Sequence, residues 1–299
     1  MNNLKNDSNN KSLGFTAVNA GNAFTLSVVF LLAFSMLLSI VTISLKIEGD
    51  VAYFLNYVPA PVSVLATLVA LYLRGQKNCF KLLKPSKVEP YSAIATALII
   101  VGLMFGLSKI NAYFITLLQS LGYVDNTPEF PLYTPTNLVL AVFLVCIIPT
   151  ITEEILMRKI VLDGLSEIGE VFAVFIGGLL FSIFHMNPAQ TIYQFIVGSA
   201  FCYIVLKGGS YFLTMLAHLF NNAFIVLNYY FFNIQFKGIV EIFVVVLGLI
   251  CFFIGAIILY KKGKKLKRKV DKNKAIEFLI GSIIGVLICI SMWISALVA

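Results

Sequence analysis

The stretch LVLAVFLVCIIPTITEEILMRKI, residues 138–160, combines a long apolar run with two adjacent carboxylates, Glu153 and Glu154. A helix of this length is long enough to cross about 30 Å of hydrocarbon. An ionisable side chain in hydrocarbon costs roughly 2.5–3.5 kcal/mol on insertion scales, so it seldom persists there without a function. The stretch therefore predicts a membrane-spanning helix that carries chemistry.

The composition of the whole chain predicts many such helices. Of the 299 residues, 60% are hydrophobic and only 12% are charged, which excludes a soluble globular protein. Because the apolar residues fall into runs of about 20, we expect an all-α, polytopic transmembrane helical bundle of eight or nine spans. The candidate spans are residues 24–45, 51–73, 91–109, 138–160, 171–187, 190–206, 211–232, 239–260 and 276–298.

The chain divides into a polar tail and one long apolar domain. Residues 1–22 are polar and rich in Asn, which predicts a disordered cytoplasmic tail. Residues 23–299 are predicted to form a single transmembrane helical domain, with a catalytic core at about 138–232.

Local signals predict irregularities within this domain. Pro59 and Pro61 should kink the second span or mark a re-entrant segment. The segment 110–121 is typical of an interfacial amphipathic helix. Gly281 and Gly285 favour close packing of the last span against another helix.

The net charge of +8 does not indicate a nucleic-acid-binding protein. Nine of the 22 basic residues lie in residues 261–274 and five lie in residues 74–87, both of which are short connections between apolar runs. Such connections mark the cytoplasmic side of a membrane protein and contact anionic lipid. We therefore expect anionic lipid at these two loops and no nucleic acid as a partner.

The same loops predict the orientation of the chain. With a cytoplasmic amino terminus, all the basic loops share one side of the membrane: residues 74–90, 161–170, 207–210 and 261–275. The abundance of Lys, Asn and Ile and the lack of an organellar targeting signal favour a bacterial protein of the plasma membrane.

The strongest candidate for chemistry is the motif EExxxR. Glu154 and Arg158 are four residues apart, so on a helix they share a face and can form an ion pair. Glu153 lies about 100° around the helix and can face a cavity. The alternative is a helix end at which the charges simply reach the interface.

Two further motifs place both histidines of the chain in apolar segments. Phe181 and His185 form FxxxH near the end of the fifth span, and His218 and Asn222 form HxxxN in the seventh. Spacing of four residues puts each pair on one helix face. A histidine of this kind is alternatively a hydrogen-bonded packing residue.

Together these residues suit hydrolysis of a peptide bond. Glu153 with His185 could hold and activate a water, and a pair formed by His218 and Asn222 could donate hydrogen bonds to an oxyanion. All four must then lie at a common depth. Counted at about 1.5 Å per residue from the cytoplasmic ends of the spans, His218 is predicted to lie several Å shallower than the others.

The order EExxxR, FxxxH and HxxxN on three apolar segments resembles the CPBP family of intramembrane proteases, which includes CAAX prenyl endopeptidases and bacterial Abi proteins. The resemblance covers about residues 138–228 and implies a bundle of about eight helices. It implies that Glu153 is the catalytic base, assisted by His185, with the oxyanion at His218 and Asn222. Glu154, Arg158 and Phe181 would support the site.

The resemblance leaves the metal open. Members of the family are often called metalloproteases, yet the chemistry can be interpreted as glutamate-dependent. Glu153, His185 and His218 are the candidate ligands for a divalent metal such as zinc. The chain has no HExxH and no CxxC, which argues against a tightly held zinc.

Three functions remain after the motifs are considered. The first is an intramembrane endopeptidase that acts on a membrane-associated peptide or protein, such as a prenylated, pheromone-type or bacteriocin-type substrate. The second is a non-catalytic membrane protein, for example a bacteriocin immunity or scaffold factor. The third is a proton-coupled transporter, for which the spacing of His218 and Asn222 has no evident use.

Overall fold

The computed structural model describes residues 15–76, 87–125, 130–266 and 270–298. Throughout these ranges the regular structure is helical, and no strand occurs. The prediction of an all-α protein is therefore confirmed.

Within the described residues, eight helical segments are long and apolar enough to cross a membrane. They are Ala17–Ser44 (α1), Gly49–Leu73 (α2 and α3), Pro90–Ser120 (α4 and α5), Pro135–Ile168 (α6 to α8), Pro188–Gly208 (ending in α10), Tyr211–Phe232 (beginning with α11), Gly238–Lys262 (α12) and Lys272–Val298 (α13). The remaining prediction, the fifth span at 171–187, corresponds to α9, Glu170–Phe184, which has only 15 residues. This outcome confirms a polytopic bundle.

Several of these segments are divided into shorter helices. The parts are α2 (Gly49–Leu55), α3 (Pro59–Leu73), α4 (Pro90–Val101), α5 (Ser108–Ser120), α6 (Pro135–Ala141), α7 (Ile148–Glu154), α8 (Leu162–Ile168), α10 (Thr191–Gly208) and α11 (Tyr211–Leu227). The break between α2 and α3 falls directly before Pro59, as the sequence predicts, because proline suits the first turn of a helix and not its interior.

The helix that carries the carboxylate pair is bounded by two irregular turns. Residues Val142–Ile147 and Ile155–Val161 are π-helical, and α7 with Glu153 and Glu154 lies between them. π-Helical turns are rare and occur frequently at functional sites. The irregular backbone therefore occurs on both sides of the carboxylate pair of the EExxxR motif.

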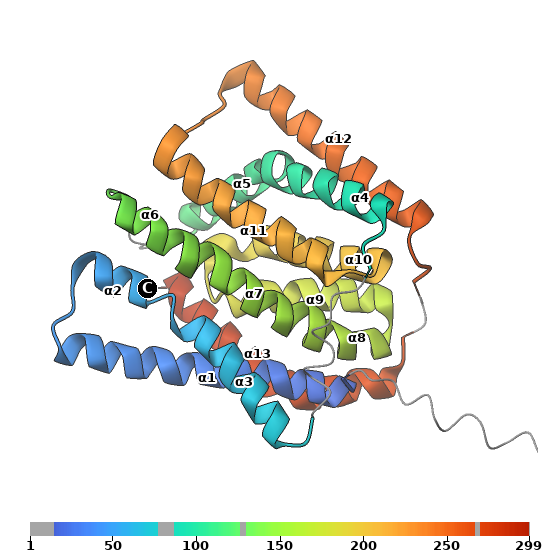
Figure 1. The fold of residues 1–299 in the computed structure, drawn as a ribbon, viewed down its shortest axis with the longest axis horizontal. Helices are drawn as coiled ribbons and strands as arrows, with labels where there is room; N and C mark the ends of the chain where they lie inside the picture. The colour runs from blue at the N-terminus through green and yellow to red at the C-terminus, as the bar shows by residue number, and fades with distance from the viewer. Residues whose placement is uncertain (1–14, 77–86, 126–129, 267–269, 299) are drawn as a thin grey trace, which may run out of the picture.

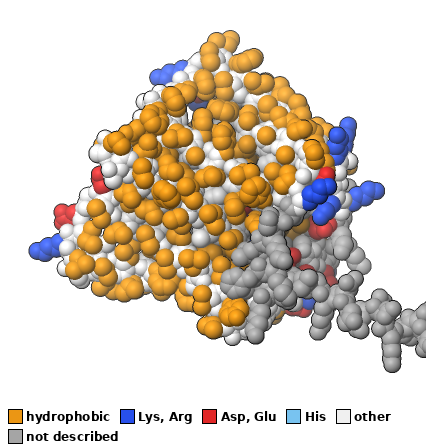
Figure 2. Space-filling model, viewed as in Figure 1, with side chains coloured by type: hydrophobic (Ala, Val, Ile, Leu, Met, Phe, Trp, Pro, Cys, Tyr) orange, Lys and Arg blue, Asp and Glu red, His pale blue; other side chains and the backbone are white. Residues whose placement is uncertain are grey.

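The helices are arranged around the elements that carry the motifs. In Figure 1, α7, α9, α10 and α11 occupy the middle of the view, with α1, α3 and α13 on one side and α4 and α12 on the other. Extensive contacts join α1 to α13, α9 to α10, and α4 to α12. Hydrophobic side chains cover most of the visible face, and lysine and arginine lie at its edges (Figure 2).

Three of the basic loops, after α8, α10 and α12, meet at one end of the bundle. Figure 1 shows these three helices ending at the right of the view. Backbone hydrogen bonds join the loops to one another: Lys264 N–H donates to Lys207 O at 3.0 Å, and Asp271 N–H donates to Ile168 O at 2.7 Å. The common side predicted for these loops agrees with this arrangement.

The first helix begins earlier than the predicted boundary at residue 22. It starts at Ala17, capped by the Thr16 side chain, and its first turn is held by carboxylates of α8. Asp163 accepts a hydrogen bond from Phe15 N–H, and Glu167 accepts one from Ala17 N–H at 3.0 Å. Negative charge at a helix N-terminus is stabilising, so α8 fixes the position of α1. The rest of the predicted tail, residues 1–14, lies outside the described residues.

Glycines bring α1 and α13 into close contact. A Cβ atom on Gly281 would lie 2.5 Å from Val18 O, and one on Gly21 would lie 2.5 Å from Phe278 O. The Gly281→Val variant is therefore expected to separate the helices and lower the thermal unfolding midpoint by several degrees. Gly122→Val, at a loop position with no neighbour within 4 Å but with a positive φ, gives the comparison for backbone strain alone. An equal midpoint in the two variants would contradict the close packing.

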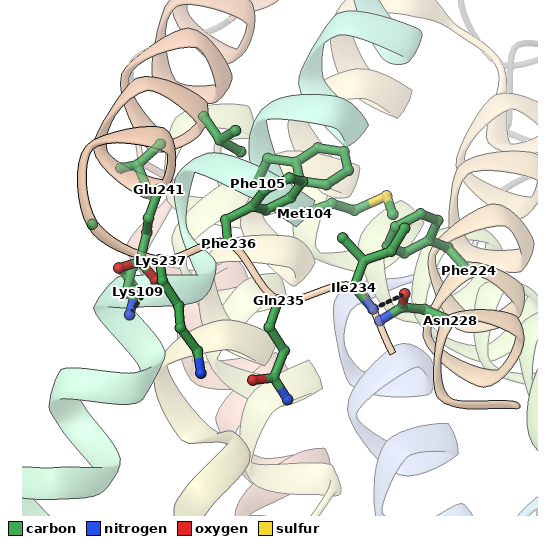
Figure 3. A pocket seen from close by; sticks show the side chains of 13 residues that line it. Met104, Phe105, Lys109, Phe224, Asn228, Ile234, Gln235, Phe236, Lys237 and Glu241 are labelled. Carbon is green, nitrogen blue, oxygen red and sulfur yellow. Dashed lines mark hydrogen bonds and ion pairs between the residues drawn. The ribbon is translucent and has the colours of Figure 1, made fainter. Parts of the chain in front are cut away.

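A charged pair divides the 31-residue segment Pro90–Ser120. Lys109 forms an ion pair with Glu241 near the start of α12, beside a cavity of about 540 Å³. In Figure 3, the amino groups of Lys109 and Lys237 point the same way, away from the aromatic rings of the cavity. Charged groups at the ends of apolar helices mark the membrane–water boundary. We infer that α4 lies in the membrane and that α5 runs beyond it, in line with the interfacial helix predicted for 110–121.

Candidate active site

The four residues predicted to be catalytic line one cavity of about 590 Å³. Glu153 comes from the end of α7, His185 from the residue after α9, and His218 and Asn222 from α11. Residues 65 positions apart in the sequence, such as Glu153 and His218, thus face the same space. The three motifs form one site in the structure.

Glu154 is the buried anchor of this site. Its side chain has no solvent exposure, and its two oxygens contact different partners: Oε1 lies 3.1 Å from His218 Nδ1, and Oε2 lies 3.4 Å from Arg158 Nε. An ionised carboxylate only accepts hydrogen bonds, so His218 donates from Nδ1. The predicted ion pair with Arg158 is present, and the contact with His218 adds a role that the sequence did not show.

Arg158 is fully enclosed and lies against aromatic rings. Its guanidinium carbon lies 4.4 Å from the centroid of the Phe181 ring and 5.3 Å from that of Phe201. Cation–π contacts of this kind stabilise a desolvated cation. Phe181 of the FxxxH motif therefore contacts the arginine of the EExxxR motif, which explains why the two motifs occur together.

His218 presents its second nitrogen to Glu153. With Nδ1 held by Glu154, Nε2 lies 4.0 Å from Glu153 Oε2, and the Glu153 side chain is 14% exposed, whereas that of Glu154 is 0% exposed. A distance of 4.0 Å is too long for a direct hydrogen bond, and a water on the cavity side of the pair could contact both atoms. Of the two carboxylates, Glu153 is the one that faces the cavity, as the helix geometry predicts.

The predicted difference in depth is wrong. His218 was expected several Å shallower than Glu153, yet the two side chains lie opposite each other. The expected depth of His218 places the start of the seventh span at the protein surface. In the structure, Ser210 and Thr214 at the start of α11 have no solvent exposure, so this end of the helix lies inside the bundle.

His185 is fixed by the backbone of its own helix. Its Nδ1 lies 2.7 Å from Phe181 O, and because a carbonyl oxygen accepts, Nδ1 is the donor. The helix then stops, and Met186 follows with φ of 51°. The other ring nitrogen of a neutral His185 is thus an acceptor for a group in the cavity.

Asn222 has a structural contact in addition to its place on the cavity wall. Its Nδ2 donates to Val145 O at 3.2 Å. Val145 lies four residues before Pro149, which has no N–H to donate to it. An amide nitrogen carries two N–H groups, so the second can serve a ligand in the cavity.

Two polar residues of the cavity were not predicted. Tyr193 donates from its hydroxyl to Asn221 Oδ1 at 2.9 Å, and Asn221 Nδ2 donates to Asn222 Oδ1 at 3.2 Å. This chain of hydrogen bonds fixes the orientation of the Asn222 amide. The adjacent asparagines were a visible signal in the sequence, whereas nothing distinguishes Tyr193 among the 13 tyrosines.

The candidate metal ligands do not form a complete ligand set. In the part of the chain that the structure describes, no group of three or more His, Cys, Asp or Glu side chains is placed to hold a metal ion. Nδ1 of each histidine is engaged within the protein, by Phe181 O and by Glu154, which leaves Nε2 of each histidine for a ligand. Glu153, His185 and His218 are not arranged as a three-residue metal site in this structure, and no chemical step is derived through a metal.

Comparison with known proteins agrees with this geometry. Residues 135–224 match the family model of the type II CAAX prenyl endopeptidases described as Rce1-like. This core is similar to that family. The match includes all three motifs and lies mostly within the predicted core of 138–232, so the resemblance to CAAX-type intramembrane proteases is confirmed for this part of the chain. No curated protein and no solved structure matches the chain.

Proposed function

We propose that the chain is an intramembrane endopeptidase that hydrolyses a peptide bond of a membrane-associated substrate with a water activated by Glu153. The observation that carries the proposal is the gap of 4.0 Å between Glu153 Oε2 and His218 Nε2, at the wall of the Rce1-like cavity. A carboxylate and an imidazole that lie side by side and face the same cavity can position a water and a scissile carbonyl there together.

In the first step, Glu153 accepts a proton from the water as the water oxygen attacks the carbonyl carbon. The electron pair of the C=O bond moves to the carbonyl oxygen, which becomes an oxyanion. His185, with its acceptor nitrogen on the same cavity, assists by orienting the water. General-base catalysis of this type contributes about 10²–10⁴-fold to a rate.

The oxyanion is stabilised by the residues opposite Glu153. When protonated on both nitrogens, His218 donates one N–H to Glu154 and directs the other toward the cavity. The free N–H of Asn222 is a second donor. Donors that are fixed before the reaction stabilise the developing charge without reorganisation.

In the second step, the oxyanion collapses and the C=O bond re-forms. The C–N bond breaks, and the proton held by Glu153 passes to the departing nitrogen. The products are a carboxylic acid and an amine, and Glu153 returns to its ionised form. All atoms and charges balance without a further reactant.

The cavity also has an apolar part suited to a membrane-associated substrate. Tyr57, Phe130, Tyr229 and Ile225 line it together with the polar site residues. Such a surface can hold hydrophobic side chains or a lipid modification next to the scissile bond. The proposed location is the bacterial plasma membrane, with the amino terminus in the cytoplasm.

The substrate can be sought by comparing membrane peptides from cells that express the wild type or Glu153→Ala. The variant is expected to accumulate an uncut precursor and to lack its cleaved product, because the base is absent while the cavity remains. Glu48→Ala is the matched control, since Glu48 directly precedes α2 and makes no capping hydrogen bond through its side chain. Identical peptide profiles in wild type and Glu153→Ala would favour a scaffold or immunity role.

A further inference from the structure

A separate cavity of about 640 Å³ lies at the end of the bundle that carries the basic loops. Three lysines line it: Lys207 at the end of α10, Lys261 at the end of α12, and Lys265 in the loop that follows. None of its lining residues is acidic. The cavity therefore concentrates positive charge in a defined space.

Lys207 is the unusual member of this group. The residue is only 6% exposed, yet its amino group makes no ion pair with any carboxylate of the described residues. Its nearest ring partners are Tyr260, at 5.4 Å from the centroid, and Tyr203, at 6.0 Å. The residue lines the cavity, and cation–π contacts at these distances are weak. Three lysines and no carboxylate around one space favour an anion there.

The loop that supplies the other lysines is fixed against Lys207. The Lys264 N–H donates to Lys207 O at 3.0 Å. Gly263 packs so closely that a Cβ atom there would lie 2.8 Å from the same oxygen. Lys261 and Lys265 are therefore held beside Lys207 by backbone contacts, and the cluster exists before any ligand binds.

The remaining walls and the location indicate the kind of anion. Val171, Val174 and Leu266 give the cavity an apolar side, and it lies where two apolar spans end. We propose that this cavity binds the phosphate group of an anionic phospholipid, with the lysines around the phosphate and the acyl chains along α9 and α12. The site is independent of the proposed protease activity and more specific than the general attraction of lipid to the basic loops.

The test is binding of phospholipid to the purified full-length protein in detergent, followed by native mass spectrometry. Wild type is expected to retain phosphatidylglycerol in preference to phosphatidylcholine. Lys207→Met keeps the length and burial of the side chain and removes the charge, so the apparent affinity for phosphatidylglycerol should fall about fivefold. Lys262→Gln is the matched control, because it removes a neighbouring exposed charge that does not line the cavity. An equal loss in both variants would overturn the proposal.

Two further measurements keep the result interpretable. If Lys207→Met unfolds, the double variant Lys261→Gln/Lys265→Gln tests the same cavity through exposed positions, and should lower binding by at least the same factor. Competition with glycerol 3-phosphate separates a lipid from a soluble phosphate. If the soluble phosphate binds while phosphatidylglycerol binds no better than phosphatidylcholine, the lipid assignment is wrong.

Discussion

The Glu153→Gln variant is expected to cleave substrate about 10²–10⁴-fold more slowly than wild type, with little change in stability. Glutamine keeps the size and the hydrogen-bonding capacity of the side chain but cannot accept a proton from water. Because Glu153 faces the cavity and Glu154 carries the buried ion pair, the exchange should leave the packing intact. The measurement is the rate of cleavage of the identified precursor in proteoliposomes, together with the thermal unfolding midpoint.

Two further variants test whether the slower cleavage comes from loss of the general base Glu153. Glu48→Gln removes a carboxylate from the start of α2, outside the site, and should retain the wild-type rate. His218→Ala should also abolish cleavage, since it removes the proposed oxyanion donor and frees Glu154 from one partner. Full activity in Glu153→Gln would exclude Glu153 as the base, whatever the substrate is.

The Arg158→Met variant is expected to lose about 3–5 kcal/mol in the free energy of unfolding. Methionine fills much of the space between the aromatic rings but leaves the carboxylate of Glu154 buried without its cation. The loss should appear as unfolding at a lower denaturant concentration. Cleavage should fall as well, because Glu154 would no longer be held in place to orient His218.

A double variant separates charge from packing. Adding Glu154→Gln to Arg158→Met removes the unpaired charge, so part of the lost stability should return. Lys159→Met is the matched single control, since Lys159 is the neighbouring cation and contacts the ring of Tyr211, with no carboxylate of the described residues at ion-pair distance. If Arg158→Met is no more destabilising than Lys159→Met, the buried ion pair does not support the fold.

The spans were predictable because each is a continuous apolar run of membrane-crossing length. Their exact ends were not. The first helix begins at Ala17 rather than after residue 22, since the backbone N–H groups at its start donate to Asp163 and Glu167 from a distant part of the chain. No local sequence pattern around Ala17 indicates that Asp163 and Glu167 contact it.

The site was predictable to the extent that it depends on spacing within one helix. The pairing of Glu154 with Arg158 follows from their separation of four residues. The contact between Glu154 and His218 depends on how deeply α11 begins inside the bundle, which no spacing reveals. The same holds for Tyr193, whose hydroxyl reaches Asn221 only through the packing of α10 on α11.

The short helix α8 has a consequence for how the whole chain is held together. It follows the carboxylate pair after one π-helical turn, and Asp163 and Glu167 on it accept hydrogen bonds from the backbone at the start of α1. Ile168, its last residue, accepts a hydrogen bond from Asp271 N–H, directly before α13. One short helix thus joins the first and the last described helices to the segment that carries Glu153 and Glu154. The stretch that matches the family is in this way linked to both ends of the described chain, by segments that carry none of its motifs.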